Sequence, residues 1–127
     1  MGDLLQQGSD WLQQQLRQHA SRTVTYARGG ESVELAATIG RTEFELSDAM
    51  GLQERFESRD FLVTAADLVL GDIVTLPLRG DRIREIDTAR TFIYEVMAPG
   101  KEPHFRFSDP YRKTLRIHTK AVAEEDT

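Results

Sequence analysis

The stretch that most constrains this chain covers residues 76–97 and reads LPLRGDRIREIDTARTFIYEVM. Its pattern is typical of a β-hairpin, because residues 81–86 alternate polar and apolar side chains and residues 87–90 form a short polar turn. The return run, residues 91–97, is dense in β-forming residues on both faces, as in a central strand that is covered on two sides. The sequence therefore predicts a core strand pair, which by itself carries no function.

Other short runs of β-forming residues flank this hairpin. The first two are joined by Gly29-Gly30, which can adopt the positive φ of a tight turn. Short strands with glycine corners favour a curved sheet, so we expect a mainly β fold, a small antiparallel β-barrel or sandwich with long loops, and of the two we favour the barrel. The runs cover residues 23–26, 32–39, 42–46, 54–63 and 114–120.

Two irregularities interrupt the alternation of these runs. Gly40 separates the second run from the third. In the run over residues 54–63, Phe56 lies on the even side while Phe61 lies on the odd side. A β-bulge near residues 58–60 would reconcile the two faces.

The first residues predict one amphipathic α-helix. Asp3 is a suitable N-cap, and leucines recur at helical spacing. Trp11 lies beside the apolar face, and Gln14 belongs to a glutamine-rich face that suits packing against a polar partner; a helix that covers its own β-core is the alternative. The expected organisation is a single domain over residues 1–127, with the helix at 3–20, the barrel at 23–120 and a disordered tail at 121–127.

Two surface features indicate contact with partners. Met50 and Leu52 are apolar residues in a predicted loop over residues 47–53, and exposed apolar loop residues favour an interface. The charge is also uneven, since residues 1–60 carry a net −4 and residues 101–120 a net +4. Opposite surfaces suit head-to-tail self-association, although scattered solvated charges explain the same counts. The residues expected at assembly interfaces are Trp11, Gln14, Met50, Leu52, Arg112, Lys113, Arg116 and Lys120.

The overall composition excludes several classes of protein. The net charge of −5, from 16 basic and 21 acidic residues, disfavours a duplex-DNA binder that neutralises phosphates. The chain has no cysteine, which excludes disulfides and thiolate metal sites. No apolar run approaches the roughly 18 residues of a membrane span, and the first residues lack the basic region of a secretory signal. An intracellular origin is expected.

No residue pattern supports catalysis. His19, His104 and His118 form no close-spaced pair and are expected to be surface residues rather than metal ligands. There is no Gly-x-Ser-x-Gly pattern and no phosphate-binding glycine loop. The tripeptide Arg79-Gly80-Asp81 lies in the predicted core hairpin, so its likeness to an integrin ligand is taken as coincidence. We expect no enzyme, no metal and no cofactor.

Three stretches together resemble one family. They are LPLRGDRI followed by YEVM in the hairpin, residues 24–44, and residues 108–120. The chain resembles the head–tail connector proteins of long-tailed phages and prophages, the lambda-type joining and stopper proteins. This resemblance implies a β-barrel that assembles as a ring, sixfold in the family, between the portal–adaptor complex and the tail. It further implies a virion protein made in the bacterial host cytoplasm, through which packaged DNA passes without specific binding, and no catalytic residue or membrane contact.

Two other functions stay open at this point. A tail-completion or tail-terminator protein has a similar size and β-content. A host small β-barrel that binds other proteins would be encoded outside any block of phage structural genes. The sequence leaves the ring number, the neck partners and the loop that faces the lumen undetermined.

Overall fold

The computed structural model describes residues 21–47, 50–51 and 53–126, and their regular secondary structure is almost entirely β-strand. The mainly β prediction is confirmed, whereas the predicted helix at residues 3–20 lies outside the described residues. The elements are β1 (Ser21–Arg28), β2 (Glu31–Ser47), β3 (Gln53–Thr64), the 3-10 turn η1 (Ala65–Asp67), β4 (Val69–Leu70), β5 (Ile73–Val74), β6 (Arg82–Asp87), β7 (Arg90–Val96), β8 (Phe105–Phe107) and β9 (Thr114–Asp126).

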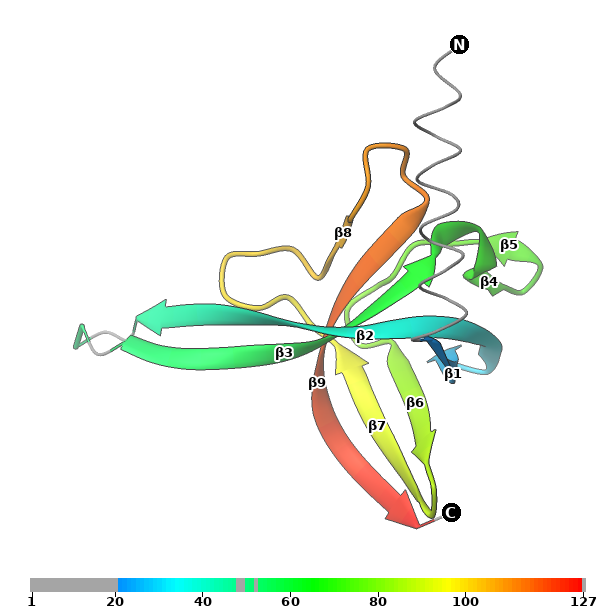
Figure 1. Cartoon of the computed structure of the whole chain (residues 1–127), viewed down its shortest axis with the longest axis horizontal. Coiled ribbons are helices and arrows are strands. Elements are labelled where there is room, and N and C mark those ends of the chain that lie inside the picture. The colour runs from blue at the N-terminus through cyan, green and yellow to red at the C-terminus, as the bar shows by residue number, and fades with distance from the viewer. Residues whose placement is uncertain (1–20, 48–49, 52, 127) are drawn as a thin grey trace.

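Seven strands form one antiparallel sheet in the order β3-β2-β1-β6-β7-β9-β8, and β4 pairs with β5 in a small separate sheet (Figure 1). Strand β9 also pairs with β3, from Arg59↔Thr119 to Thr64↔Thr114. Six strands are therefore linked in a closed circuit of hydrogen-bonded pairs, and β8 adds to the outside of β9.

The core lies between these strands and is built from their inward-facing side chains. Tyr26, Phe61, Leu115 and Ile117 are fully buried, and the Phe61 and Tyr94 rings meet edge to face with centroids 5.4 Å apart. The single turn η1 places Leu68, also fully buried, against them. The rest of the core cluster consists of Val24, Leu35, Ala37, Val63, Leu70, Ile83 and Val96.

The hairpin predicted at residues 76–97 is confirmed as β6 and β7. Its strands pair from Arg82↔Glu95 to Asp87↔Arg90, so the connection is the two-residue turn Thr88-Ala89. Strand β7 has β6 on one side and β9 on the other, which explains its dense β-forming composition. The tight turn at Gly29-Gly30 is confirmed as well, with Gly29 at φ +60°.

The two predicted irregularities, a strand interruption at Gly40 and a β-bulge near residues 58–60, are both wrong. Strand β2 continues through Gly40, and its register with β3 runs without a shift from Ala37↔Val63 to Ser47↔Gln53. No bulge is needed near residues 58–60, because β3 is buried on both faces there. Phe61 faces the core, while Ser58 and Asp60 are buried on the other face. A register shift occurs instead where β7 meets β9, between Ile93 and Tyr94.

Two predictions about the last strand also need correction. The tail from residue 121 is not disordered but continues β9, pairing from Ala121↔Tyr94 to Asp126↔Arg90. His118 is not a surface residue: it is 2% exposed, because the face of β9 opposite the core is covered by β2 and β3. Long-range pairing, which short runs of sequence do not reveal, decides both cases.

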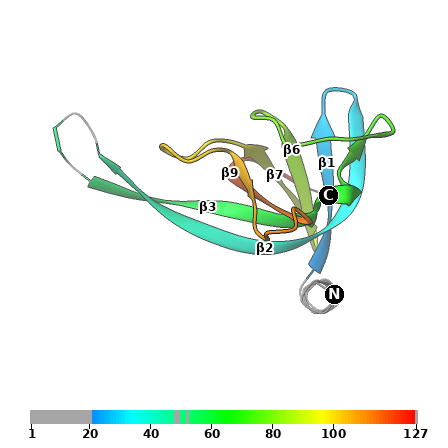
Figure 2. The same ribbon diagram turned by 90° about the horizontal axis from the view of Figure 1, so that it is seen from above.

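Strands β2 and β3 are much longer than their neighbours, and their far halves project from the rest of the protein (Figures 1 and 2). Strand β2 has 17 residues, beyond the roughly 3–10 that are usual. Its pairing with β1 ends at Thr38, and β3 leaves β9 at Arg59. We name the projecting part, residues 41–57, the arm.

Candidate functional site

The arm is a two-stranded ribbon whose faces differ in character. Thr42 and Phe44 are half-buried, whereas Arg41, Glu43 and Glu45 are exposed on the other face. This alternation follows from the period of two along a strand. Beyond the last pair of the arm, Ser47↔Gln53, Met50 is 87% exposed, as predicted for this interface residue. The arm itself projects away from the closed part of the sheet (Figure 2).

Aromatic packing fixes the arm where it leaves the body. Phe44 and Phe56 lie opposite each other in the register, with ring centroids 6.0 Å apart. The Phe44 ring also meets the edge of the His118 ring from β9, at 5.5 Å. The base of the arm is therefore packed on the closed part of the sheet, and only the portion beyond these rings extends freely from it.

A buried polar cluster centred on Asp60 joins the same three strands. Its carboxylate accepts hydrogen bonds from Thr42, from Ser58 at 2.6 Å, from Arg116 at 2.7 Å and from His118 Nδ1 at 2.8 Å. Burial would raise the pKa of Asp60, but these hydrogen bonds outweigh it and hold the pKa well below its ordinary value. The carboxylate is therefore ionised and holds β2, β3 and β9 together.

This cluster lacks the geometry of nucleophilic catalysis although it contains a serine, a histidine and an aspartate. Both Ser58 Oγ, at 3.4 Å, and Asp60 Oδ1, at 2.8 Å, face the same nitrogen, Nδ1 of His118. A catalytic triad requires the serine and the carboxylate on opposite ring nitrogens. Ser58 instead donates its hydroxyl hydrogen bond to Asp60 and so stabilises the buried carboxylate.

Gly40 allows Arg116 to reach this cluster. A Cβ at this position would lie 3.2 Å from an Arg116 guanidinium nitrogen and 3.2 Å from a Leu62 methyl carbon. The same guanidinium group donates to the carbonyl of Arg41 at 3.0 Å. The sequence predicts that Gly40 interrupts a strand, but it is instead a point of close approach between β2 and a side chain of β9.

A second buried carboxylate, Asp81, fixes the start of the hairpin. It accepts hydrogen bonds from Tyr26, from Arg28 at 2.8 and 2.9 Å, and from the Leu78 backbone at 2.9 Å. Burial opposes its ionisation, but the Arg28 bond and the others lower its pKa, while burial and the Asp81 contact raise the pKa of Tyr26. Asp81 is only 4% exposed, so the Arg79-Gly80-Asp81 tripeptide is structural and does not present its carboxylate to solvent.

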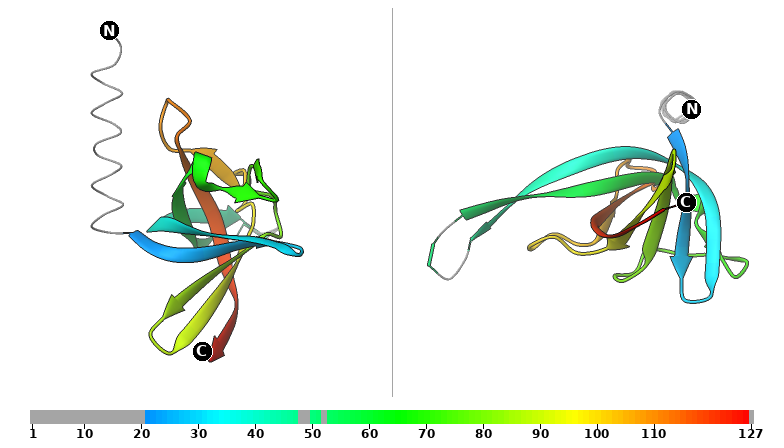
Figure 3. Two further views of the ribbon diagram at one scale, coloured as in Figure 1. Left: turned by 90° about the vertical axis from the view of Figure 1, so that its right-hand side faces the viewer. Right: turned by 90° about the horizontal axis from the view of Figure 1, so that it is seen from below.

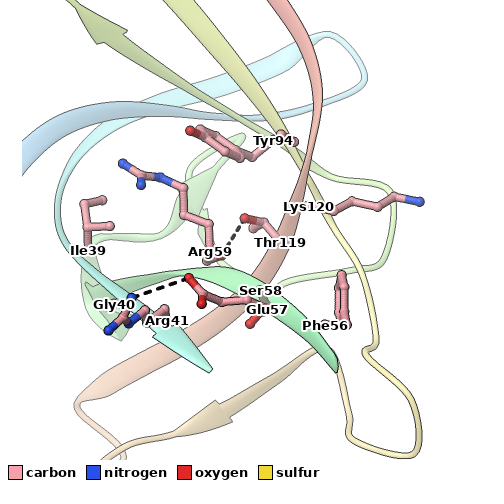
Figure 4. Close-up of a pocket in the computed structure, with 11 residues that line it drawn as sticks. Ile39, Gly40, Arg41, Phe56, Glu57, Ser58, Arg59, Tyr94, Thr119 and Lys120 are labelled. Atoms are coloured by element: carbon pink, nitrogen blue, oxygen red, sulfur yellow. Dashed lines mark hydrogen bonds and ion pairs between the residues drawn. The ribbon is translucent and has the colours of Figure 1, made fainter. Parts of the chain in front are cut away.

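A pocket of about 620 Å³ lies between the base of the arm and strands β7 and β9 (Figure 4). Arg59 is its central charged group: it forms an ion pair with Glu85 at 2.7 Å and lies over the Tyr94 ring at 5.1 Å. Thr119 donates to the Arg59 carbonyl at 2.6 Å. Within the part of the chain that the structure describes, no group of three or more His, Cys, Asp or Glu side chains could hold a metal ion.

The segment after β4 carries an exposed apolar surface that the sequence analysis did not identify. We name it the apolar strip, made of Ile73, Val74, Leu76 and Leu78, which are 69%, 62%, 49% and 52% exposed. Four large apolar residues within six positions are a detectable signal. The signal is obscured in the sequence because Pro77 and Gly80 make the segment resemble the entry to the core hairpin.

The predicted interface residues do not form one site. Arg112 lies in the β8–β9 turn at φ +56°, above the Phe107 ring, and Lys113 follows it. Arg116 is engaged with Asp60, and Lys120 is exposed beside the pocket. Trp11, Gln14 and Leu52 lie outside the described residues. Met50 stands apart from the basic residues, at the end of the arm.

The fold and these surfaces define a small antiparallel β-protein whose exposed features suit contacts with other proteins. The chain belongs to the phage head-tail joining protein family, whose model matches residues 2–126. The resemblance drawn from the hairpin and from residues 24–44 and 108–120 is confirmed, and the family is one of structural phage proteins rather than of enzymes. Membership implies a place at the head–tail junction of a virion. None of the curated proteins matches the sequence.

The described residues include no helix with the length and apolar character needed to cross a membrane.

Proposed function

We propose that this protein joins head to tail in a long-tailed phage or prophage by forming a ring at the neck. The family match over residues 2–126 carries the proposal, because it covers both the closed part of the sheet and the arm. In this proposal the closed circuit of six strands is a small barrel that acts as a rigid scaffold. The arm, the loops and the charged surfaces are the parts that contact other proteins.

The proposed partners are the portal–adaptor complex on one side, the tail on the other, and copies of the same chain within a sixfold ring. A ring requires a heterologous contact, in which two different surfaces of the chain meet across neighbouring copies. The net charge of −5 is compatible with a DNA passage, since an acidic protein repels the duplex and lets it move through without specific binding.

Electron microscopy of particles made without the gene tests this function. We expect full heads without tails together with free tails of normal length, because both halves are complete and only the junction is missing. Adding the purified full-length protein to such a lysate restores tailed particles. The same lysate supplemented with buffer is the control.

Each competing function gives a different picture in that experiment. Overlong tails identify a terminator, which stops tail polymerisation and binds tail-tube ends. Normal virions at normal number identify a protein with no role in assembly, such as a host binding module. Either result overturns the proposed joining function.

A further inference from the structure

Beyond its base, the arm has no strand beside it among the described residues. The pairing of β2 with β1 ends at Thr38, and that of β3 with β9 begins only at Arg59. Both outer edges of the arm therefore present backbone N–H and C=O groups to their surroundings. An isolated two-stranded ribbon is marginally stable in water, and open edges are templates for pairing with another chain. These properties favour a contact that covers the arm.

The apolar strip is exposed but held in place. The Thr75 backbone donates to the Leu68 carbonyl at 2.9 Å, and Arg28 donates to the Leu76 carbonyl at 2.7 Å. His104 donates to the carbonyl of the buried Pro77 at 2.7 Å. A fixed surface of large apolar side chains loses little conformational entropy on binding, which makes it suitable for a protein contact.

The arm and β5, which carries Ile73 and Val74 of the apolar strip, lie at opposite ends of the long axis of the molecule. In Figures 1 and 2 the arm extends to the left and β5 lies at the right, and the right panel of Figure 3 shows the same separation. One chain cannot bring these two surfaces together. Two copies in the same orientation along that axis can bring the arm of one copy to the apolar strip of the other. Repetition of this heterologous contact closes a ring when the rotation between copies allows it.

Charges support the same pairing. Glu43 and Glu57 are exposed and lie directly opposite each other in the register, a cross-strand pair of like charges. The exposed Arg41 pairs with Glu57 at 3.9 Å, so among the described side chains Glu43 and Glu45 are the arm glutamates that no ion pair engages.

The apolar strip is followed at once by the exposed Arg79. The exposed Arg112 lies in the β8–β9 turn. This turn is bound to η1, because the Lys113 carbonyl accepts a hydrogen bond from the Ala65 backbone, and η1 in turn contacts β5. The exposed Asp72 precedes the strip, so the cations lie at its Leu78 end and in the β8–β9 turn, where they suit an acidic arm.

We infer that the arm of one copy docks against the apolar strip of a second copy of this chain. Met50 at the end of the arm lies on Ile73 and Val74 of the neighbour, and the arm glutamates face the neighbour's Arg79 and Arg112. This contact rests on the proposed ring and specifies which surfaces build it. The apolar strip of each copy binds the arm of one neighbour, and its own arm binds the apolar strip of another neighbour.

Cysteine crosslinking tests the pairing directly, because the natural chain has no cysteine. We would carry Met50→Cys and Val74→Cys on one full-length chain, assemble virions with it, and treat them with a short bis-maleimide. A ladder of covalent multimers is expected, whereas either single variant gives none. Ile86, which is 64% exposed near the end of β6, is the matched control: Met50→Cys with Ile86→Cys gives no ladder.

Two results overturn the inference. Dimers from Met50→Cys alone indicate a symmetrical arm-to-arm contact, and virions that contain the double variant without any crosslink show that the arm binds something else. Loss of the proposed joining function has a different signature, since the protein is then absent from normal virions altogether. Particle composition, read from the same samples, therefore separates the two failures.

Self-association of the purified chain gives an independent measurement. Ile73→Ser with Val74→Ser raises the dissociation constant of the self-contact by roughly tenfold or more, because two large apolar side chains no longer leave water on binding. Ile86→Ser leaves it unchanged. An unchanged dissociation constant for the double variant, with the circular dichroism spectrum of the unaltered protein, contradicts the assignment of the strip.

Discussion

The carboxylate of Asp60 connects three strands through single hydrogen bonds to Thr42, Ser58, Arg116 and His118. It is fully buried, so its ionised form depends on these donors. Removing one partner of such a buried pair leaves the other without compensation, which is strongly destabilising. The stability of the arm base therefore depends on this side chain more than on the arm's exposed ion pairs.

The effect of Asp60 on stability depends on pH. Its folded-state pKa lies below the value of about 3.9 in an unfolded chain. The unfolded chain therefore takes up the proton first as the pH falls, and the stabilisation is complete above about pH 4–5 and lost below it. In urea titrations from pH 7 to pH 2, we expect the free energy of unfolding to fall below about pH 4.

Asp60→Asn should lower the free energy of unfolding at pH 7 by about 3 kcal/mol and flatten its decline at acidic pH. Part of the decline remains, because the pKa of Asp81 is also lowered. Glu102→Gln, at an exposed loop position, is the control and leaves the profile unchanged. An equally steep acidic decline in Asp60→Asn and in the unaltered protein contradicts the assignment.

Gly40 and Gly30 offer a matched pair of glycine substitutions. Gly40→Ala should cost about 1 kcal/mol of stability, because its Cβ would crowd Arg116 and Leu62 at 3.2 Å. Gly30→Ala meets nothing within 4 Å and should be neutral or slightly stabilising. Thermal denaturation of both variants checks this, and equal melting temperatures would show that the arm base tolerates the added methyl group.

Strands β6 and β7 could be predicted because they are adjacent in the sequence and their signals are local. Alternation and a two-residue turn identify them without knowledge of the rest of the chain. The buried position of His118 was not predictable, since the group that covers it, Phe44, belongs to a distant strand. The same applies to Asp81, whose partner Arg28 lies 53 residues away in the sequence.

The β6–β7 hairpin contains a direct comparison of a buried and an exposed isoleucine. Ile83 is 1% exposed, and Ile83→Ala should lower the free energy of unfolding by about 2–4 kcal/mol. Ile86, on the same strand, is largely exposed, and Ile86→Ala should change it by less than about 0.5 kcal/mol. Urea denaturation measures both, and similar losses for the two variants would contradict the placement of β6.

The arm should be separable from the fold. Glu45 and Arg55 lie directly opposite each other, so replacing residues 46–54 by Asn-Gly yields a tight two-residue hairpin. We expect stability to change by about 1 kcal/mol or less, because the aromatic base remains, while tailed particles fall to the level seen without the gene. Denaturation and particle counts by electron microscopy provide the two readouts.

An equivalent change elsewhere controls for turn replacement as such. Thr88-Ala89→Asn-Gly alters the β6–β7 turn without shortening it and should leave particle counts at the unaltered level. Normal numbers of tailed particles from the shortened arm would mean that the arm takes no part in joining. The length of this arm could not be predicted from the sequence, because Gly40 has the appearance of a strand end although β2 pairs with β3 through it, from Ala37 to Ser47.

The whole molecule is acidic, which leads to an expectation about DNA. At about 0.15 M salt the purified protein should not retard duplex DNA, meaning a dissociation constant weaker than about 10⁻⁴ M. Changing the exposed Glu43, Glu45 and Glu57 to Lys should create salt-dependent retardation, which serves as the positive control. Retardation by the unaltered protein at this salt concentration would contradict free passage of the duplex.

The strand content and a curved sheet could be predicted from the sequence, but the pair of strands that closes the sheet could not. The residue pattern of each run indicates a strand. The β3–β9 pairing, however, joins residues 59–64 to residues 114–119, which are far apart in the sequence. Nothing in either run specifies the other as its partner. The same is true of the last residues of β9, whose pairing with β7 overrides a charged composition that is typical of a solvated tail.

Because β9 supplies the pairing that closes the circuit, synthesis of the chain has a defined order of events. Strands β1 to β3 and β6 to β7 are local hairpins that can form as they emerge, while β3 keeps an unpaired edge until residues 114–119 have been made. A chain that stops before β9 retains that open edge and lacks Arg116 and His118 at the base of the arm. Such incomplete chains therefore carry an arm without the aromatic and charged contacts that hold its base.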